Sequence, residues 1–337
     1  MALIRLSKEA YFNNIDEISK KSGGKDRIIL VLKDNAYGHG AKEIGSLAKS
    51  SGIKKCAVKN EDEARELSQF FPWILILSHR PTGKEDPRFI YAINDFSQIN
   101  KLAPHTKVHL ALDSLMHRNG ITKDELKPAL KLISEQQLEL IGAYTHYRAA
   151  DEFSADFYVQ RKSYLELKEF LREEASKFGY SLCFHSQNTA ALQRLDLLDD
   201  DFIRVGMAQF GYKQLNHNSL NLKIVLKLYA NKISQRVLQK GQRVGYGGVF
   251  KADEEMMIAT YDLGYGDGLF RCKLAKNPLL QNGENILGKM SMDSFVAKDL
   301  GDEVCVIDDA RVWARAFDTI EYEILVKLSS KIERVIV

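Results

Sequence analysis

The sequence predicts an α/β protein with an N-terminal (β/α)8 TIM barrel followed by a C-terminal mostly-β domain. In the first two thirds of the chain, eight short apolar runs alternate with amphipathic segments of helix length. From about residue 218 onward, apolar and polar residues alternate and glycines are frequent, as is typical of β-structure. A chain of 337 residues is long enough to hold both a barrel and a smaller domain.

The eight candidate strands of the barrel are short runs dominated by apolar residues. They lie at about 28–33, 54–59, 73–78, 88–93, 107–113, 138–146, 181–185 and 202–206. Several spacers between them carry the periodicity of amphipathic helices, notably residues 122–137 and 155–178. Eight βα units in roughly 200 residues favour a barrel over an open Rossmann sheet, which uses fewer parallel strands per domain.

The chain divides where the pattern changes. We expect the barrel to span residues 8–217 and the C-terminal β domain to span residues 218–337, with residues 1–7 adding a strand to the second domain. The glycine-rich stretches "GYGGVF" and "GYGDGLF" of the second domain do not complete a GxGxxG motif. Neither lies between a strand and a helix, so no dinucleotide-binding fingerprint is supported.

Composition excludes several classes of partner. Hydrophobic residues make up 45% of the chain and charged residues 28%, which is typical of a globular protein with a large core. The net charge is only +3 and no Lys/Arg stripe is interleaved with aromatic residues, so we expect no nucleic-acid binding. The apolar runs are far shorter than the ~20 residues of a membrane-spanning helix. The stretch "MALIRLSKEA" lacks the long apolar core of a secretory signal, so we expect a cytoplasmic protein.

The cysteines give no sign of a metal site or a disulfide framework. They lie far apart and form no CxxC pair, at Cys56, Cys183, Cys272 and Cys305. We therefore expect all four thiols to be reduced and no metal to be bound.

Polar side chains stand at or near the carboxyl ends of the apolar runs, where a TIM barrel collects its catalytic groups. They are Lys33, Asn94, Asp113, His146, His185 and Arg204. In "LVLKDNAYGHG", Lys33 is either a strand-terminal lysine that extends to solvent or an amine held unprotonated for a Schiff base with an aldehyde cofactor. The phenol of Tyr37 and the two glycines that follow it suit the second role, because glycine lets the backbone approach a phosphate or a ring.

Two further strand ends suit a phosphate. In "DFIRVGMAQFGY", Arg204 lies inside an apolar run, and Gly206 and Met207 follow where backbone N–H groups can bind an anion. Arg204 has the alternative of pairing with an acid such as Asp201. In "FHSQNTAAL", Thr189 is either a helix cap or a phosphate ligand.

The β domain contributes one candidate proton carrier. Tyr265, within "LGYGDGLFR", is either a packing residue or a general acid and base, if a nearby cation stabilises its phenolate.

Together these stretches resemble the alanine racemases, pyridoxal-phosphate enzymes of fold type III, over nearly the whole chain. "VLKDNAYGHG" is similar to the cofactor-lysine motif of that family and "LGYGDG" to its catalytic tyrosine motif. Five further stretches are similar to segments of the family: "MHRNG", "YTHYRAADE", "RVGMAQFGY", "MSMDS" and "TIEYEI". The resemblance implies a barrel, a C-terminal β domain and a head-to-tail homodimer with active sites shared across the interface.

The same resemblance implies the activity, which is the interconversion of L-alanine and D-alanine to supply D-alanine for peptidoglycan synthesis. Lys33 would hold pyridoxal 5'-phosphate as a Schiff base and handle the α-proton of D-alanine, while Tyr265 of the partner subunit handles that of L-alanine. A base on each face of Cα gives racemisation.

The remaining site residues also follow from the resemblance. Arg204 would face the pyridine nitrogen and keep it unprotonated. His146 would orient and tune Tyr265, and His185 would line the cofactor ring or support Arg204. The implied phosphate contacts are Tyr37, Thr189, Gly206, Met207 and Tyr322, and the implied contacts to the substrate carboxylate are Arg118 and Met292.

One departure from the family pattern affects charge. In "VHLALDSLMHRNG", Ala111 stands where many members have a lysine, often carbamylated and paired with the loop arginine. We therefore expect a bound chloride or another small anion near Ala111 and Arg118. Ser114 and Leu115 also replace the usual glycine of this loop, so the local backbone is expected to differ.

Three alternatives stay open. The first is a broad-specificity racemase of small amino acids such as serine. The second is a fold type III decarboxylase, although "MSMDS" has a methionine where such enzymes present a cysteine. The third is a non-catalytic pyridoxal-phosphate-binding protein, which resembles the barrel half alone; the β domain and Tyr265 argue against it.

Overall fold

The computed structural model describes residues 1–196, 198–215, 220–271 and 277–337. The chain folds into two compact units. The barrel unit comprises Phe12–Lys33 and Gly45–Lys223, and the β unit comprises Met1–Tyr11, Asp34–Ile44 and Ile224–Val337. The expected boundary between residues 217 and 218 lies outside the described residues and stays a prediction.

The barrel unit contains eight parallel strands in the order β8-β7-β6-β5-β4-β3-β2-β9. The strands are β2 (Ile28–Val31), β3 (Lys55–Val58), β4 (Trp73–Ile76), β5 (Ile90–Ile93), β6 (Lys107–Ala111), β7 (Glu139–Tyr144), β8 (Cys183–His185) and β9 (Ile203–Val205). Backbone hydrogen bonds from Phe202 N to Phe184 O (3.2 Å) and from Arg204 N to Gln187 O (2.9 Å) link the chain around β9 to that around β8. The sheet therefore curves into a nearly closed barrel, and all eight predicted strands are confirmed.

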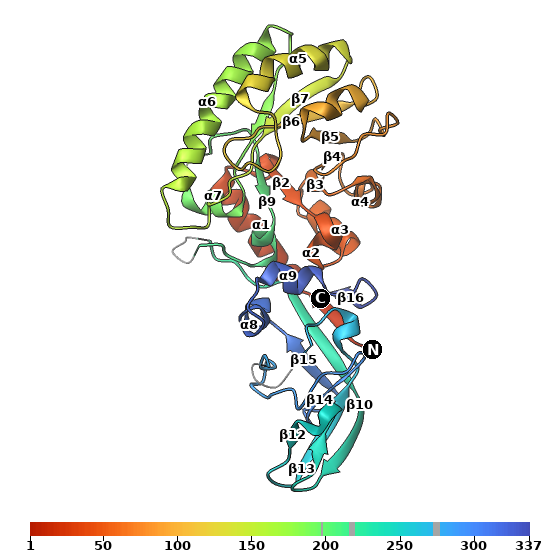
Figure 1. Cartoon of the computed structure of the whole chain (residues 1–337). Coiled ribbons are helices and arrows are strands. Elements are labelled where there is room, and N and C mark those ends of the chain that lie inside the picture. The colour runs from red at the N-terminus through yellow and green to blue at the C-terminus, as the bar shows by residue number, and fades with distance from the viewer. Residues whose placement is uncertain (197, 216–219, 272–276) are drawn as a thin grey trace. The chain divides into compact units, whose positions relative to one another are not determined.

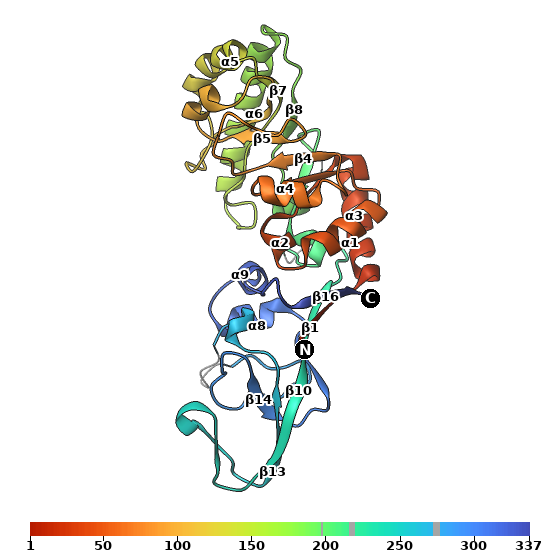
Figure 2. The same ribbon diagram turned by 90° about the vertical axis from the view of Figure 1, so that its right-hand side faces the viewer.

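Helices cover the outside of this sheet (Figures 1 and 2). They are α1 (Lys8–Ser22), η1 (Lys25–Arg27), α3 (Ala41–Ser50), α4 (Glu61–Leu67), η2 (Phe96–Lys101), η3 (Lys123–Glu125), α5 (Leu126–Glu135), α6 (Asp156–Ser176), α7 (Thr189–Arg194) and η4 (Met207–Phe210). The predicted helix at 122–137 is confirmed as η3 and α5; it begins at a capping box between Thr122 and Glu125. The predicted helix at 155–178 is confirmed as α6.

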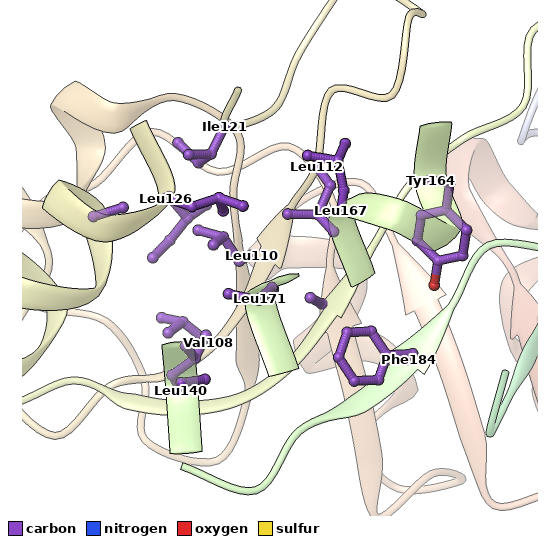
Figure 3. Close-up of a cluster of buried hydrophobic side chains, with 14 of the residues drawn as sticks. Val108, Leu110, Leu112, Ile121, Leu126, Leu140, Tyr164, Leu167, Leu171 and Phe184 are labelled. Carbon is purple, nitrogen blue, oxygen red and sulfur yellow. The ribbon is translucent and has the colours of Figure 1, made fainter. Parts of the chain in front are cut away.

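Apolar side chains of the strands pack against α5 and α6, as Figure 3 shows. Each residue of this cluster is at most 5% exposed; among them are Val108, Leu110, Leu126, Leu140, Leu167, Leu171 and Phe184. Truncating one such leucine to alanine costs about 2–5 kcal/mol, so the cluster fixes the strands whose ends carry the site.

The β unit is built on a six-stranded sheet in the order β14-β13-β10-β1-β16, with β15 also paired to β10. Its strands are β1 (Leu3–Leu6), β10 (Leu226–Leu238), β13 (Met256–Tyr261), β14 (Phe295–Lys298), β15 (Glu303–Ile307) and β16 (Glu333–Ile336). The other elements are the hairpin of β11 (Arg243–Val244) and β12 (Phe250–Lys251), and η5 (Tyr246–Gly248), η6 (Tyr265–Asp267), α8 (Ala310–Ala316) and α9 (Glu321–Val326). The N-terminal strand β1 pairs antiparallel with β10 and parallel with β16.

Three of the cysteines, Cys56, Cys183 and Cys305, are free thiols, as predicted. Cys272 lies outside the described residues. Over the described ranges, none of the helices combines the length and apolar character that crossing a membrane requires.

A buried carboxylate holds the loop after β4. Glu85 is 7% exposed and accepts hydrogen bonds from Thr82 N (2.7 Å), Ala103 N (2.7 Å) and His79 Nε2 (3.0 Å). Burial alone would raise the pKa of Glu85, but the hydrogen bonds from His79, Thr82 and Ala103 outweigh it and lower the pKa to about 2. The ionised carboxylate therefore ties this loop to the segment that precedes β6.

We expect Glu85→Gln to lower the free energy of unfolding by roughly 2 kcal/mol at pH 7. The NH2 group of the glutamine would replace one carboxylate oxygen, so backbone N–H donors that now have an acceptor would face another donor. The pKa of Glu85 rises from about 2 in the fold towards its ordinary 4.5 on unfolding, so the carboxylate stabilises the fold above pH 4.5 and this contribution disappears as pH falls towards 2. The difference in free energy of unfolding between wild type and variant should be constant from about pH 6 to 8 and become smaller below about pH 4.5.

Urea unfolding followed by circular dichroism at stepped pH measures this difference. Glu66→Gln, at an exposed position of α4, is the matched control and should leave stability unchanged. A loss of unfolding free energy in Glu85→Gln that does not vary with pH would contradict the stabilising role of the ionised carboxylate.

Candidate active site

Lys33 directly follows a buried strand and precedes a strained turn. The strand β2 ends at Val31, and Leu32 N still donates to Ala57 O of β3 at 2.9 Å. The four residues from Asp34 to Tyr37, within α2 (Lys33–Tyr37), have φ angles of 53°, 55°, 51° and 53°, in the left-handed region. That conformation costs roughly 1–2 kcal/mol for each non-glycine residue, and such strain clusters at functional sites.

Contacts inside the β unit hold the turn in place. Asn35 Oδ1 accepts a hydrogen bond from Ala41 N at 2.8 Å. Gly38 has a φ of +79°, and a Cβ there would lie 1.9 Å from Leu325 O of α9, so only glycine fits. Arg334 donates to Gly38 O from Nε (3.1 Å) and Nη2 (2.9 Å).

These contacts of the turn with α9 and Arg334 bring together two predicted phosphate contacts. The rings of Tyr37 and Tyr322 meet edge to face with centroids 5.8 Å apart. Tyr37 is 6% exposed, so its ring is fixed and its orientation follows from the turn.

Arg204 occupies the centre of the polar cluster in the barrel unit. It is 5% exposed; its Nη1 donates to His185 Nδ1 (2.6 Å) and His185 O (2.6 Å), and its Nη2 donates to Thr145 O (2.7 Å). Within the described residues it forms no ion pair, and its Nε–H donates no hydrogen bond. Asp201 instead accepts from Phe184 N at 2.8 Å, so the alternative pairing of Arg204 with Asp201 is wrong.

The partners of Arg204 are neutral. Burial, together with the charge of Arg204, lowers the pKa of His185 well below its ordinary value. Tyr144 stacks on His185 with centroids 5.1 Å apart and donates to Asn94 Oδ1 at 3.2 Å. Burial raises the pKa of Tyr144 to about 12, although the charges of Arg204 and Arg118 oppose the shift. The guanidinium therefore has only neutral hydrogen-bond partners among the described residues, and its positive charge is available to an anionic ligand.

His146 follows β7 and its side chain is exposed. Desolvation and the charges of Arg204, Arg118 and Lys33 lower the pKa of His146 to about 3. His146 is neutral at pH 7 and can accept a hydrogen bond.

Thr189 supplies a buried hydroxyl that has no partner. The residue is 4% exposed and its Oγ1 makes no hydrogen bond to the described part of the chain. It is not the helix cap, because Asn188 Oδ1 accepts from Ala191 N at 2.9 Å and caps α7. A hydroxyl left unpaired in this way suits an external acceptor such as a phosphate oxygen.

The turn from β9 into η4 is rigid. Gly206 precedes η4, and Met207 is fully buried. The amide of Gln209 donates to Val31 O (3.1 Å) and Gly206 O (3.0 Å). These bonds fix the start of η4 beside the end of β2, close in sequence to Lys33.

In the β unit, Tyr265 and Met292 lie side by side. Tyr265 N donates to Ser291 O (3.2 Å) and Gly266 N donates to Met292 O (2.8 Å). The guanidinium of Arg271 lies 5.7 Å from the centroid of the Tyr265 ring. Arg271 was not predicted as a site residue, although it stands at the end of the same quoted stretch, and its guanidinium lies within the range of a cation–π contact with the Tyr265 ring.

The loop after β6 departs from a relaxed backbone. Ala111 ends β6 and is 4% exposed in an apolar cluster with Ile90 and Tyr144. Leu115 has a φ of 82°, a conformation typical of glycine, and Arg148 donates to its carbonyl. Arg118 is exposed and has no hydrogen bond or ion pair to the residues that the structure describes.

The predicted site residues fall into two groups. The barrel unit holds Lys33, Arg118, His146, His185, Thr189, Arg204, Gly206 and Met207, and the β unit holds Tyr37, Tyr265, Met292 and Tyr322. Direct contacts join Arg204 to His185, Tyr37 to Tyr322, and Gly266, the residue after Tyr265, to Met292. The buried neighbours of Arg204, which are Tyr144, Thr145 and His109, were not predicted as site residues, since nothing in a single strand shows which side chains meet across a barrel.

Comparison with known proteins identifies the family. The model of the alanine racemase N-terminal domain matches residues 6–214, and that of the alanine racemase C-terminal domain matches residues 225–336. The chain is 55% identical over 335 residues to the alanine racemase of Campylobacter curvus, covering 99% of both chains. It is similar to the solved alanine racemase of Bacillus anthracis with bound L-Ala-P, at a TM-score of 0.90 and 27% identity, covering 100% of this chain and 95% of that one.

A third relative is the solved alanine racemase of Bartonella henselae with covalently bound pyridoxal phosphate. It has a TM-score of 0.83 and 24% identity, covering 100% of this chain and 99% of that one, and it supports the fold. By the matches over its whole length, this chain belongs to the alanine racemase family.

Proposed function

We propose that this protein interconverts L-alanine and D-alanine in the cytoplasm with pyridoxal 5'-phosphate as its cofactor, and so supplies D-alanine for peptidoglycan synthesis. One observation carries the proposal: the barrel unit holds a lysine at the end of β2 and a buried guanidinium that keeps one N–H unused by the described residues. Family membership over the full chain supports the same conclusion.

The residues of the barrel unit fit the three functional groups of this cofactor. The amine of Lys33 suits the aldehyde, and the unpaired hydroxyl of Thr189 suits the phosphate. The Nε–H of Arg204 suits the pyridine nitrogen, because a guanidinium donates a hydrogen bond without giving up its proton. Tyr37 and Tyr322 would add phenolic contacts to the phosphate from the β unit. When bound, the cofactor supplies an electron sink for the charge that develops at Cα.

The protein's part in racemisation is to move one proton on each face of Cα. Lys33 Nζ would exchange a proton with the face that leads to D-alanine, and the hydroxyl of the partner's Tyr265 would exchange one with the other face. Neutral His146 would accept a hydrogen bond from that hydroxyl and orient it. Arg271 would stabilise the phenolate while the proton is away.

Arg204 would limit the reaction to racemisation. Burial lowers the pKa of Arg204 below its ordinary value, but a guanidinium still keeps its proton in proteins. A ring nitrogen held by this guanidinium would therefore stay unprotonated, and the cofactor would supply only a moderate electron sink. This favours rapid return of a proton to Cα over side reactions such as transamination.

The substrate carboxylate would bind to Arg118 and to the backbone of Met292. We also propose that a chloride or similar anion near Ala111 pairs with Arg118, since Ala111 has no side chain that can carry a charge. Residues from both units serve one substrate in this scheme, so we propose a head-to-tail homodimer with shared sites.

The two-base assignment predicts different defects at the two residues. In deuterated water, Lys33→Ala should form no deuterated alanine from either enantiomer. Tyr265→Phe should slow racemisation by roughly 10²–10⁴-fold, the usual contribution of a general acid or base, yet still exchange the α-hydrogen of D-alanine through Lys33. Chiral chromatography with mass spectrometry separates these outcomes.

Tyr246→Phe is the control for that experiment, because Tyr246 is 62% exposed and should leave the rate unchanged. Racemisation by Tyr265→Phe at the wild-type rate would contradict the assignment. The same assay with L-serine tests the broad-specificity alternative, and release of CO2 tests the decarboxylase alternative.

Shared sites predict complementation between inactive variants. When Lys33→Ala and Tyr265→Phe chains pair at random, half of the dimers are mixed and one site in each mixed dimer is intact. Co-expression should therefore restore about one quarter of the wild-type activity, measured on purified dimers. No recovery, despite mixed dimers seen by native mass spectrometry, would mean that each site is formed by one chain.

The anion proposal predicts halide dependence. Replacing chloride by gluconate should raise KM for L-alanine roughly fivefold, equivalent to about 1 kcal/mol for an exposed charge pair. Ala111→Asp should remove this dependence, because a fixed carboxylate replaces the ion. Crystals grown in bromide should show anomalous scattering near Ala111, and its absence together with an unchanged KM would exclude the anion.

A further inference from the structure

A β-bulge in the barrel wall places an extra histidine behind the Arg204 cluster. Between β6 and β7 the register shifts, so that Val108 pairs with Leu140 but His109 pairs with Gly142. Ile141 is the additional residue of the bulge. His109 is fully buried in the barrel interior.

Gly142 is the position that makes room for this histidine. A Cβ on Gly142 would lie 2.5 Å from His109 Cε1, 2.6 Å from His109 Nε2 and 2.8 Å from Cys183 Sγ. The imidazole therefore fills the space of the missing side chain. Trp73 contacts the same ring edge to face with centroids 5.5 Å apart, so the ring cannot turn.

The hydrogen bonds around His109 form a chain with a single direction. Arg204 Nη1 can only donate, so His185 Nδ1, 2.6 Å away, must accept. Neutral His185 then carries its proton on Nε2 and donates to His109 Nδ1 at 2.8 Å. His109 in turn has its proton on Nε2, which faces Cys183 Sγ at 3.8 Å.

The bulge closes this chain. Cys183 Sγ lies 3.3 Å from Ile141 O and donates to it, and Ile141 is the extra residue of the bulge. Both imidazoles stay neutral at physiological pH. Burial lowers the pKa of His109 to about 3, and the charge of Arg204 adds to this shift. In the described part of the chain, no group of three His, Cys, Asp or Glu side chains has the arrangement of a metal site, so the two histidines act as hydrogen-bonding groups.

We propose that His109 is a positioning residue for the reaction. By accepting a hydrogen bond from His185 Nε2, it fixes the tautomer of His185. That tautomer holds Arg204 with its Nε–H directed at the cofactor ring. The part that concerns the cofactor rests on the function proposed above. If His109 offered no acceptor, His185 could move its proton to Nδ1, where it would face the donor Nη1 of Arg204. Two donors in contact would repel, and the guanidinium would shift.

The test compares His109→Phe, which keeps a ring but offers no acceptor, with His109→Asn, whose Oδ1 takes the place of Nδ1. The first readout is the tautomer of His185 in protein labelled with 15N-histidine, measured without substrate or cofactor. Wild type and His109→Asn should show His185 protonated on Nε2 alone, whereas His109→Phe should show a mixture of tautomers. Loss of the 15N signals in His185→Gln assigns the resonances.

The second readout is kinetic. His109→Phe should lower kcat roughly ten- to a hundredfold, the cost of misplacing a group by about an ångström, with KM changed little, and His109→Asn should recover most of it. His185 protonated on Nδ1 in the wild type, or on Nε2 alone in His109→Phe, would overturn the proposal. So would equal kcat losses in the two variants.

The two readouts separate this proposal from the proposed function. A wild-type protein without racemase activity but with the expected tautomers would contradict the function and leave the assignment of His109 to His185 and Arg204 standing. If His109→Phe does not fold by circular dichroism, the tautomer of the wild type and the kinetics of His109→Asn still decide the question.

Discussion

The buried charge of Arg204 is the constraint on which the chemistry of the barrel depends. The guanidinium is 5% exposed and contacts neutral groups, namely two carbonyl oxygens and one imidazole nitrogen at 2.6–2.7 Å. A buried charge without a counter-ion costs several kcal/mol unless each partner presents a lone pair. Arg204 therefore requires a lone pair from Thr145 O and from His185 Nδ1, and His109 Nδ1 supplies the acceptor that the proton on His185 Nε2 then needs.

Backbone strain occurs in two segments that adjoin predicted site residues. The turn from Asp34 to Tyr37 and the residue Leu115 both have positive φ angles that L-residues rarely adopt. Each is held by side chains that reach it: Asn35 and Arg334 at the first, and Arg148 at the second. Strain that the surrounding structure maintains in this way keeps Lys33 and the Arg118 loop in fixed places instead of letting them relax.

The sequence allowed the prediction of features that depend on local patterns. Apolar runs of five to nine residues located all eight strands, because buried parallel strands are nearly continuous in hydrophobicity. The polar residues at their ends identified Lys33, His185 and Arg204. Contacts across the barrel were out of reach: His109 in β6 meets His185 in β8 across 76 residues of sequence. The left-handed turn after Lys33 was also missed, since none of its residues from Asp34 to Tyr37 is a glycine. The bulge at Ile141 was missed although Gly142, the next residue, is of the type that often marks a bulge inside a strand.

Charge balance at the barrel mouth connects the departure at Ala111 with the neutral histidines. Arg204, Arg118 and Lys33 all lower the pKa of His146, so three positive groups act on one small region. The hydrogen-bond partners of Arg204 there are neutral, and Ala111 has no side chain that could carry a charge. Such a region attracts a phosphate and a carboxylate and repels further cations. A further positive charge on His146 or His185 would be repelled by these cations, and both imidazoles have lowered pKa values. The positive charge therefore stays on the groups that we propose to bind the ligand.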